Sequence, residues 1–541
     1  MDNKNGFQST LGTAVVLSLA ACFMFFIYAP LELYFTNQGE FFYDIYILFP
    51  LVFCIFLFFL GISIGFFWLL RKTKWYDLCL YTYFVTFICS YVQGNFLVDW
   101  LPLINGKMLN WNDYSAERIK CVLLWVIVIG LLLLLYKKKG KSFTNKFIKV
   151  ASSCMGLMFL LTICILCVTT GGYQKKQILS TATSKNILTM SEEKNFVILV
   201  LDSVDSPVLN EIITNESDEY KEIFDDFTYY TNAMAGYPYT SHSIPLILTG
   251  DWFQKQCSFE EFSQQAYKNS PLFKNLEKED YKIGVYESNF AVDAADRNRF
   301  DNILDCQRRV SSFFTFCRWQ IQMTGYRYAP FDLKRFCYVY TNAFNTLKAL
   351  PDGEELFYFE NTCFWDILSK EQIDLVDQKC FRFIHVEGAH APFLYDEDMN
   401  VTKESNSYET AVKACLTMTK RYMEMIKESG IYDNTCIIIM ADHGAGSGFN
   451  DNPILFIKGF NERHEMRTND APISYDDLQE AYERLLSGKS SSELFDWQEG
   501  DYRERRLLFQ DDDNNPMEIM EEYIQKGHAG NWDTLIKINE F

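Results

Sequence analysis

Five long apolar runs lie in the first 170 residues of this 541-residue chain. Most of them approach the roughly 20 residues that a helix needs to cross the hydrocarbon core of a bilayer. The runs are 11–33, 45–70, 78–98, 121–136 and 147–168. The alternative is a soluble domain with buried helices, but five such runs in so short a stretch are hard to bury. The pattern therefore predicts a transmembrane bundle of five helices over residues 1–172.

Basic loops set the predicted orientation of this bundle. Segments 71–74 and 137–141 are rich in Lys and Arg, and the positive-inside rule places both in the cytoplasm. The acidic loop 36–44 and the longer loop 99–118 then lie outside. Five spans that begin inside place everything after residue 168 outside the cytoplasm, anchored in the cell membrane.

The remainder of the chain is strongly acidic. The first 172 residues carry 13 Lys and Arg against 8 Asp and Glu, so a net charge of −20 for the whole chain leaves −25 for the rest. This negative charge argues against nucleic acid as a partner, because phosphate backbones bind to basic surfaces. The eight cysteines after residue 172 form no C-x-x-C pair, which argues against zinc ribbons and thioredoxin chemistry. Their even number permits disulfides outside the cytoplasm, with no pairing indicated.

From residue 195 onward, short β-branched runs alternate with amphipathic stretches, and a polar linker, 173–194, precedes them. The alternation predicts an α/β sandwich with a mainly parallel central sheet over 195–541. The segment from about residue 490 has no assigned role in it. Chemistry in such sheets collects at the carboxyl ends of the strands. The predicted strands are 196–201, 281–286, 381–386 and 436–440, and the clearest helix is 409–428, closed by Gly430.

Two polar clusters come directly after predicted strands. Asp202 follows strand 196–201, and the pair Asp442-His443 follows strand 436–440. A carboxylate oxygen and an imidazole nitrogen at a strand end suit Zn²⁺ or Mn²⁺. Simpler interpretations stay open, namely a strand-terminating Asp that caps the next helix and a turn with a solvated His.

Hydroxyl and imidazole groups supply the remaining candidates. Thr240 begins a segment that indicates a turn feeding a helix, where threonine is ordinarily a cap. On a cation its hydroxyl would have a lowered pKa, and the helix N-terminus would stabilise an alkoxide and a phosphate. His385 and His390 lie at the end of strand 381–386 and in the loop after it. An imidazole there can bind a phosphoryl oxygen, protonate a leaving group or have no role.

In this order and spacing the clusters resemble the alkaline-phosphatase/sulfatase superfamily. More narrowly, they resemble its membrane-bound transferases, the lipoteichoic acid synthases and the lipid A phosphoethanolamine transferases, over about residues 10–480. In those enzymes an acidic residue after the first strand, a threonine nucleophile and an Asp-His pair bind one metal. Segment 385–392 is similar to their H-x-x-G-S-H-G-P, whose second His contacts substrate. The matching metal-site residues here are Asp202, Thr240, Asp442 and His443.

Departures from these families narrow the expected chemistry. Asp202 stands where the two transferase groups have Glu, and the further His that the lipid A enzymes place after the Asp-His pair is missing. The C-x-P-x-R or S-x-P-x-R signature of true sulfatases is absent as well, because Thr240 is followed by Ser-His-Ser-Ile. Sulfate-ester hydrolysis through formylglycine is therefore not expected, and the donor headgroup stays open.

The resemblance implies a two-step transfer on one divalent cation, Zn²⁺ or Mn²⁺. Thr240 would attack the headgroup phosphodiester of a phospholipid donor, and diacylglycerol would leave a phospho-threonine behind. A glycan or glycolipid acceptor of the cell envelope would then take the phosphoglycerol or phosphoethanolamine group, with His385 and His390 binding substrate. Two alternatives stay open, a membrane-anchored hydrolase of phosphodiesters or sulfate esters and a lipid sensor or scaffold without catalysis.

An aromatic and basic stretch, 313–338, interrupts the predicted catalytic domain. It includes Arg318, Trp319, Tyr326 and Arg335. Such a stretch indicates either an ordinary packed helical region or one that rests on the membrane surface.

Overall fold

The computed structural model describes residues 2–98, 101, 109–175, 180–215, 218–288, 290, 292, 295–339, 341–445, 452–510 and 520–541. The predicted loop 99–118 and linker 173–194 are therefore described only in part. The chain divides into two compact units. The first comprises Met1–Ile178 and Cys306–Ala349, and the second comprises Leu179–Asp305 and Leu350–Phe541.

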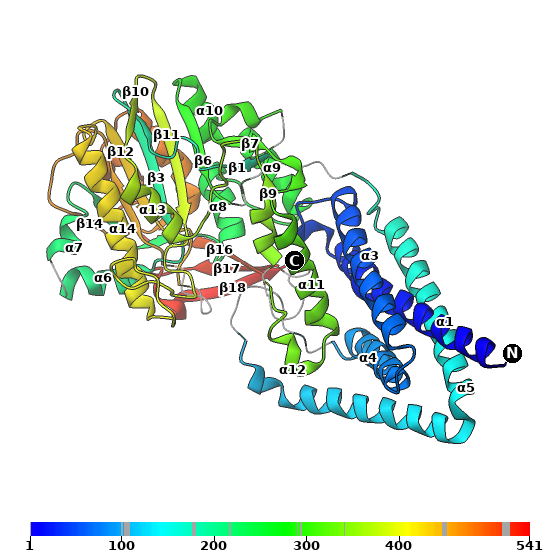
Figure 1. Cartoon of the computed structure of the whole chain (residues 1–541). Helices are drawn as coiled ribbons and strands as arrows, with labels where there is room; N and C mark the ends of the chain where they lie inside the picture. Colours follow the sequence, from blue (N-terminus) through cyan, green and yellow to red (C-terminus); the bar gives the residue numbers. More distant parts are fainter. Residues whose placement is uncertain are drawn as a thin grey trace. The chain divides into compact units, whose positions relative to one another are not determined.

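The first unit is built from long helices, whose N-terminal members are blue and cyan in Figure 1. α1 (Asp2–Phe23), a π-helical turn (Met24–Tyr28) and α2 (Ala29–Thr36) follow one another without a break. α3 (Ile45–Leu70) begins where the Asp44 side chain accepts hydrogen bonds from two backbone N–H groups, which caps the helix. α4 (Tyr76–Phe96) and α5 (Ser115–Thr169) complete this series.

Three helices of the described residues are long and apolar enough to cross a membrane, namely Leu11–Thr36, Ile45–Leu70 and Trp111–Thr169. The last contains both the fourth and the fifth predicted runs. Gly140, with φ 75° and ψ 173°, interrupts the helical backbone between them. The third run lies in α4, where Tyr, Thr, Ser and Gln stand among the apolar residues. Helices thus occupy all five predicted positions, while the count of five spans stays a prediction.

The segment Cys306–Ala349 packs with the first unit, although the sequence places it inside the predicted domain 195–541. It forms α11 (Phe313–Tyr328) and α12 (Phe331–Lys334). Phe316, Met323 and Tyr328 are buried in the same apolar core as residues of the N-terminal helices. Tertiary contacts therefore assign this segment to a unit that its position in the sequence does not indicate.

Polar contacts join α11 to α2 and α4. Arg327 forms an ion pair with Glu32, and its Nε donates to the carbonyl oxygen of Gly94 at 2.7 Å. Gln93 Nε2 donates to the carbonyl oxygen of Tyr328 at 2.8 Å. A glycine is needed at position 94 because a Cβ there would come within 2.3 Å of the Tyr328 ring. Close packing and buried polar contacts together fix α11 against the N-terminal helices.

A seven-stranded sheet forms the centre of the second unit, in the order β14-β4-β13-β12-β3-β11-β6. β12, β3, β11 and β6 are neighbours and run parallel, whereas β13 is antiparallel to both of its neighbours. The predicted mainly parallel sheet is therefore confirmed. The bounds are β14 (Arg467–Asn469), β4 (Thr228–Tyr230), β13 (Leu455–Lys458), β12 (Thr435–Met440), β3 (Asn195–Leu201), β11 (Cys380–Val386) and β6 (Lys282–Tyr286).

Helices pack on both sides of this sheet (Figure 1). The predicted helix 409–428 is α14 (Tyr408–Glu428), which begins at a Ser407 cap and ends before Gly430 with φ 74°. Because every residue of β3, β11 and β12 is buried, these strands need cover on both faces. One group of helices is α6 (Ser206–Asn215), α13 (Asn361–Lys370) and α14, and the other is α8 (Thr240–Thr249), α9 (Phe259–Asn269), α10 (Pro271–Lys278) and α15 (Leu478–Leu486).

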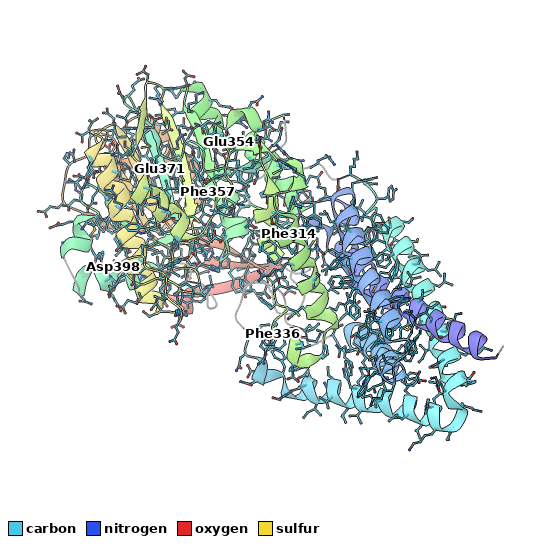
Figure 2. All side chains as sticks on the ribbon, in the orientation of Figure 1. Phe314, Phe336, Glu354, Phe357, Glu371 and Asp398 are labelled. Carbon is cyan, nitrogen blue, oxygen red and sulfur yellow. The ribbon has the colours of Figure 1, made fainter. Side chains whose placement is uncertain are left out.

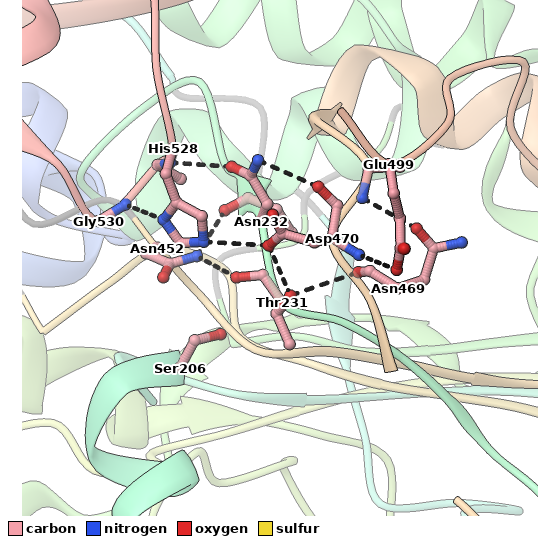
Figure 3. Close-up of polar contacts among 12 residues, drawn as sticks. Ser206, Thr231, Asn232, Asn452, Asn469, Asp470, Glu499, His528 and Gly530 are labelled. Atoms are coloured by element: carbon pink, nitrogen blue, oxygen red, sulfur yellow. Dashed lines mark hydrogen bonds and ion pairs between the residues drawn. The ribbon is translucent and has the colours of Figure 1, made fainter. Parts of the chain in front are cut away.

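A small antiparallel sheet, β16 (Arg505–Gln510), β17 (Met520–Gln525) and β18 (Leu535–Glu540), lies within the segment that the sequence leaves unassigned. Figure 3 shows how the loop after β17 is held at the carboxyl ends of β4 and β14. His528 Nε2 lies 3.3 Å from Asp470 Oδ1, which also accepts from Thr231 at 2.9 Å. The Asn232 side chain accepts from the backbone of Ala529 at 2.9 Å. All 16 cysteines of the chain are free thiols, so no disulfide contributes.

Removing the Arg327 guanidinium tests how the Cys306–Ala349 segment is held. Arg327→Met leaves Glu32 without its ion-pair partner in a largely buried position. We expect the free energy of unfolding to fall by about 2 kcal/mol, which is less than the loss of a fully buried pair would cost. Thermal unfolding in detergent and limited proteolysis within 306–349 measure the effect. The control is Arg335→Met, at an exposed arginine. Equal behaviour of the two variants would contradict the assigned role of Arg327.

Candidate active site and metal centre

Four neighbouring parallel strands deliver polar side chains to one edge of the sheet. Asp202 comes directly after β3, and Asp442 and His443 follow β12. His385 lies near the end of β11, opposite Val200 of β3 in the strand register. Glu287 comes directly after β6, the next strand beyond β11. Because the strands are parallel, their carboxyl ends meet and these side chains converge.

Imidazole and carboxylate groups lie close together there. His443 Nε2 is 3.4 Å from Asp442 Oδ2 and 3.7 Å from Asp202 Oδ1. His385 Nε2 is 3.7 Å from Asp202 Oδ2 and 3.9 Å from Asp442 Oδ2. All four side chains are buried. Asp202, His385 and Asp442 each offer a ligand atom, and these atoms lie within 4.8 Å of one another.

Thr240 reaches the same cluster from α8. It is the first residue of that helix, so its backbone stands at the positive end of the helix dipole. Its Oγ1 donates to Asp202 Oδ2 at 3.0 Å and lies 3.4 Å from His443 Nε2. The four residues that the sequence predicts as metal ligands are therefore assembled in one place.

The donor set fits a divalent cation. Among the described residues, the buried atoms without a hydrogen-bond partner include His385 Nε2 and Asp442 Oδ2. Leaving a buried carboxylate oxygen and a buried imidazole nitrogen unpaired is costly unless another group satisfies both. Carboxylate oxygens with imidazole nitrogens suit Zn²⁺ or Mn²⁺. We therefore count His385 with the residues that could hold the cation.

Glu287 is a site residue that the sequence interpretation missed. Its Oε2 is in contact with His385 Nδ1, and both side chains are buried. A carboxylate on Nδ1 fixes the orientation of the ring and leaves Nε2 for the cluster. Its position directly after strand 281–286 is the signal that could have identified it, since Asp202 stands in the same position after its own strand.

The charges of the cluster shift three pKa values. Burial alone would raise the pKa of Asp202, but the nearby imidazoles of His385 and His443 hold it below its ordinary value. Burial and the nearby Asp202 raise the pKa of Asp442. Burial lowers the pKa of His385, but Glu287 and Asp202 outweigh this effect and hold the pKa well above its usual range. The two carboxylates therefore favour the charged form of His385.

Backbone contacts set the position of the carboxylates. Gly388, with φ 59°, lies against the end of β3, where a Cβ would come within 2.3 Å of Asp202 N. Ala389 N donates to the Asp202 carbonyl oxygen at 2.8 Å. Ser203 N donates to Asp442 Oδ1 at 3.2 Å, which ties the ends of β3 and β12 together. The loop after β11 is therefore part of the support of the site.

His390 lies in the same loop but is exposed, and its Nδ1 is 2.8 Å from the Ala391 carbonyl oxygen. It adds the smallest contribution to the lowering of the Asp202 pKa. The structure thus separates the two histidines that the sequence predicts as substrate-binding. His385 is buried in the cluster and His390 is exposed beside it, so the predicted role in substrate contact suits His390.

Comparison with protein families finds a match to the family described as Sulfatase, over residues 194–477. The matched range is just over half of the 541-residue chain and contains every residue of the cluster. The comparison with curated proteins finds no match.

Several solved structures are similar in fold. Ps i-CgsB in complex with k-i-k-neocarrahexaose is 14% identical, with a TM-score of 0.41 over 62% of this chain and 82% of that one. An alkaline phosphatase superfamily protein from Vibrio parahaemolyticus is 14% identical, with a TM-score of 0.35 over 66% and 84% of the two chains. The phosphonate monoester hydrolase SpPMH from Silicibacter pomeroyi is 12% identical, with a TM-score of 0.35 over 64% and 88%. These likenesses concern the fold, and the family assignment rests on the matched range 194–477 alone.

Loss of one carboxylate or one imidazole should release the cation. We expect Asp442→Asn and His443→Ala each to lower the zinc or manganese content of the purified chain at least tenfold, because each removes a direct ligand. Mass spectrometry of the metal content after gel filtration without chelator measures this. His528→Ala, a histidine outside the cluster, is the matched control. Full metal content in the Asp442 and His443 variants would show that the cluster is not the metal site.

Protons and the cation should compete for His385. Since its pKa is raised, binding at neutral pH displaces a proton, and apparent zinc affinity should rise about tenfold per pH unit below that pKa. Glu287→Gln removes the main charge that raises the pKa of His385. The zinc affinity of this variant should therefore stop rising at a lower pH. Calorimetric zinc titration across pH measures the profile, with Glu371→Gln as an exposed control. An unshifted profile in Glu287→Gln would contradict the coupling.

Proposed function

Because the chain belongs to the sulfatase family, we propose that it is a metal-dependent enzyme that transfers the phosphoryl headgroup of a phospholipid to an envelope glycan or glycolipid. The observation that carries this proposal is the placement of Thr240. Its hydroxyl stands at a helix N-terminus within 3.0 Å of Asp202 and 3.4 Å of His443, in place of the convertible Cys or Ser of true sulfatases. A threonine cannot become formylglycine, but it can form a phosphoester.

The cluster supplies what an attacking hydroxyl needs. Asp202, Asp442, His443 and His385 would hold the cation. When bound, it would lower the pKa of the Thr240 hydroxyl and neutralise negative charge on the phosphoryl group. Asp202 accepts the hydrogen bond of that hydroxyl and so orients it. The N-terminus of α8 stabilises the developing charge on Thr240 and on an approaching phosphate.

Two half-reactions follow from this arrangement. In the first, the Thr240 hydroxyl gives up its proton and its Oγ1 bonds to phosphorus, the bond from phosphorus to the diacylglycerol oxygen breaks, and the leaving alkoxide takes up a proton. In the second, an acceptor hydroxyl attacks the phospho-threonine, loses its proton and regenerates the Thr240 hydroxyl. His390, exposed beside the cluster, is placed to hold or supply the proton of the leaving group.

A membrane location supports a lipid donor. Among the residues that the structure describes, three helices are long and apolar enough to cross a bilayer. In the first unit, Gln320 Nε2 donates to Tyr43 Oη at 2.8 Å, and Arg308 pairs with Asp44 at 2.9 Å. The loop predicted to lie outside therefore meets a segment that comes after residue 168, which the five-span topology also places outside. We propose that topology, with an extracytoplasmic catalytic domain anchored in the cell membrane.

Replacement of the nucleophile tests the chemistry. Thr240→Ala should lose essentially all transfer and all phospho-enzyme, whereas Ser241→Ala, one residue along the same helix turn, should keep both. Acid-quenched incubation with headgroup-labelled phospholipid, followed by peptide mass spectrometry, locates the phosphoryl adduct. Activity of Thr240→Ala at the level of the unchanged chain would overturn the assignment.

The products distinguish transfer from its alternatives. Reconstituted chain is supplied with labelled phosphatidylglycerol or phosphatidylethanolamine and a glycolipid acceptor. Transfer predicts substituted acceptor in step with diacylglycerol, whereas a hydrolase would release free headgroup phosphate. A sensor or scaffold would release neither, although the complete set of cluster residues weighs against that alternative.

A further inference from the structure

The segment Cys306–Ala349, here called the basic insertion, differs in charge from the sequence around it. It carries seven Lys and Arg and a single acidic residue, Asp332, a balance of +6 in a part of the chain that is otherwise strongly acidic. Asp332 pairs with Arg118 at 2.9 Å, so the one negative charge is already neutralised. In the described part of the chain, no carboxylate pairs with Arg309, Arg318 or Arg335. The insertion therefore presents unbalanced positive charge.

One face of α11 is buried and another is exposed. Phe316, Gln320 and Met323 face the core of the first unit. Phe314, Arg318 and Ile321 recur at spacings of four and three residues, which places them on one stripe of the helix. All three are exposed, Phe314 to 83%. The helix therefore presents an outward stripe of two apolar side chains with an arginine between them.

A second exposed apolar group lies at and just beyond the end of α12. Phe336 is 64% exposed, and Leu333 is exposed beside it. The Arg335 guanidinium stands 4.7 Å from the centre of the Phe336 ring. Figure 2 labels Phe314 of α11 and Phe336, which comes just after α12. Large exposed aromatic groups beside unpaired arginines occur at both places.

We propose that the basic insertion lies on the surface of an anionic phospholipid bilayer, with Phe314 and Phe336 in the acyl boundary and Arg318 and Arg335 at the phosphates. Aromatic and aliphatic side chains alternating with arginine match the layered polarity of that interface. The apolar helices with which the insertion shares a core supply continuity with the same bilayer. The proposal rests on the membrane location proposed above and not on the reaction.

Charge complementarity favours lipid over a protein partner. An anionic leaflet attracts this positively charged segment. The arginine side chains can reach lipid phosphates while their aliphatic stems lie along apolar surface. The same surface would hold phospholipid molecules beside a chain that uses them as donor. The insertion would thus act as a lipid-gathering surface distinct from the metal cluster.

Photocrosslinking tests the contact directly. The full chain carrying Thr240→Ala, which prevents turnover, is reconstituted in liposomes of phosphatidylglycerol and phosphatidylcholine in equal parts. p-Benzoylphenylalanine replaces Phe314 or Phe336 and, as a lipid-facing reference, Phe58 of α3, which is 63% exposed. Tyr502 of the second unit, 69% exposed, is the matched aqueous position. Mass spectrometry of the irradiated chain then identifies lipid or protein adducts.

We expect lipid adducts at positions 314, 336 and 58 and background levels at 502. Arg318→Glu with Arg335→Glu should lower the yield at 314 and 336 several-fold in the anionic liposomes and leave that at 58 unchanged. Background lipid-adduct yield at 314 and 336 with normal yield at 58 would overturn the proposal for the basic insertion and leave the membrane location standing. Protein adducts in place of lipid would overturn it in favour of a protein interface. Background yield at 58 as well would overturn the membrane location too, whereas transfer activity is measured separately.

Discussion

Two buried carboxylates at one edge of the sheet impose the constraint on which the site depends. Asp202 and Asp442 lie within a group of ligand atoms that spans no more than 4.8 Å. Like charges removed from water repel strongly, so this pair persists only with compensating positive charge close by. His385 supplies such charge because Glu287 stabilises its protonated form. A divalent cation would supply the charge in place of that proton and would satisfy the unpaired atoms as well.

The fold serves this cluster through strand order. Neighbouring parallel strands β12, β3, β11 and β6 end at the same edge, and each contributes a charged side chain there. α8 then brings a hydroxyl to the cluster at its N-terminus, where the helix dipole favours negative charge. Gly388 allows the loop after β11 to pack against the backbone of Asp202. Sheet, helix and loop thus fix a nucleophile beside a metal site before any substrate binds.

Much of the fold and part of the site were accessible from the sequence. The strands ending before Asp202 and Asp442 are short apolar runs, and the residue after such a run is easily identified. Glu287 obeys the same rule, but its importance depends on β6 pairing with β11, a long-range contact that no local pattern reveals. The place of Cys306–Ala349 in the first unit was equally hidden, because close packing and the Arg327–Glu32 pair join residues nearly three hundred positions apart.

One cation and the Thr240 hydroxyl share a single site in the mechanism that we propose. Anomalous diffraction from crystals of the full chain grown with Zn²⁺, collected on both sides of the zinc absorption edge, is the decisive test. We predict one strong peak within coordination distance of Asp202, Asp442, His443 and Thr240, with His385 Nε2 facing it. A zinc peak bound elsewhere, with none at this cluster, would contradict the shared site.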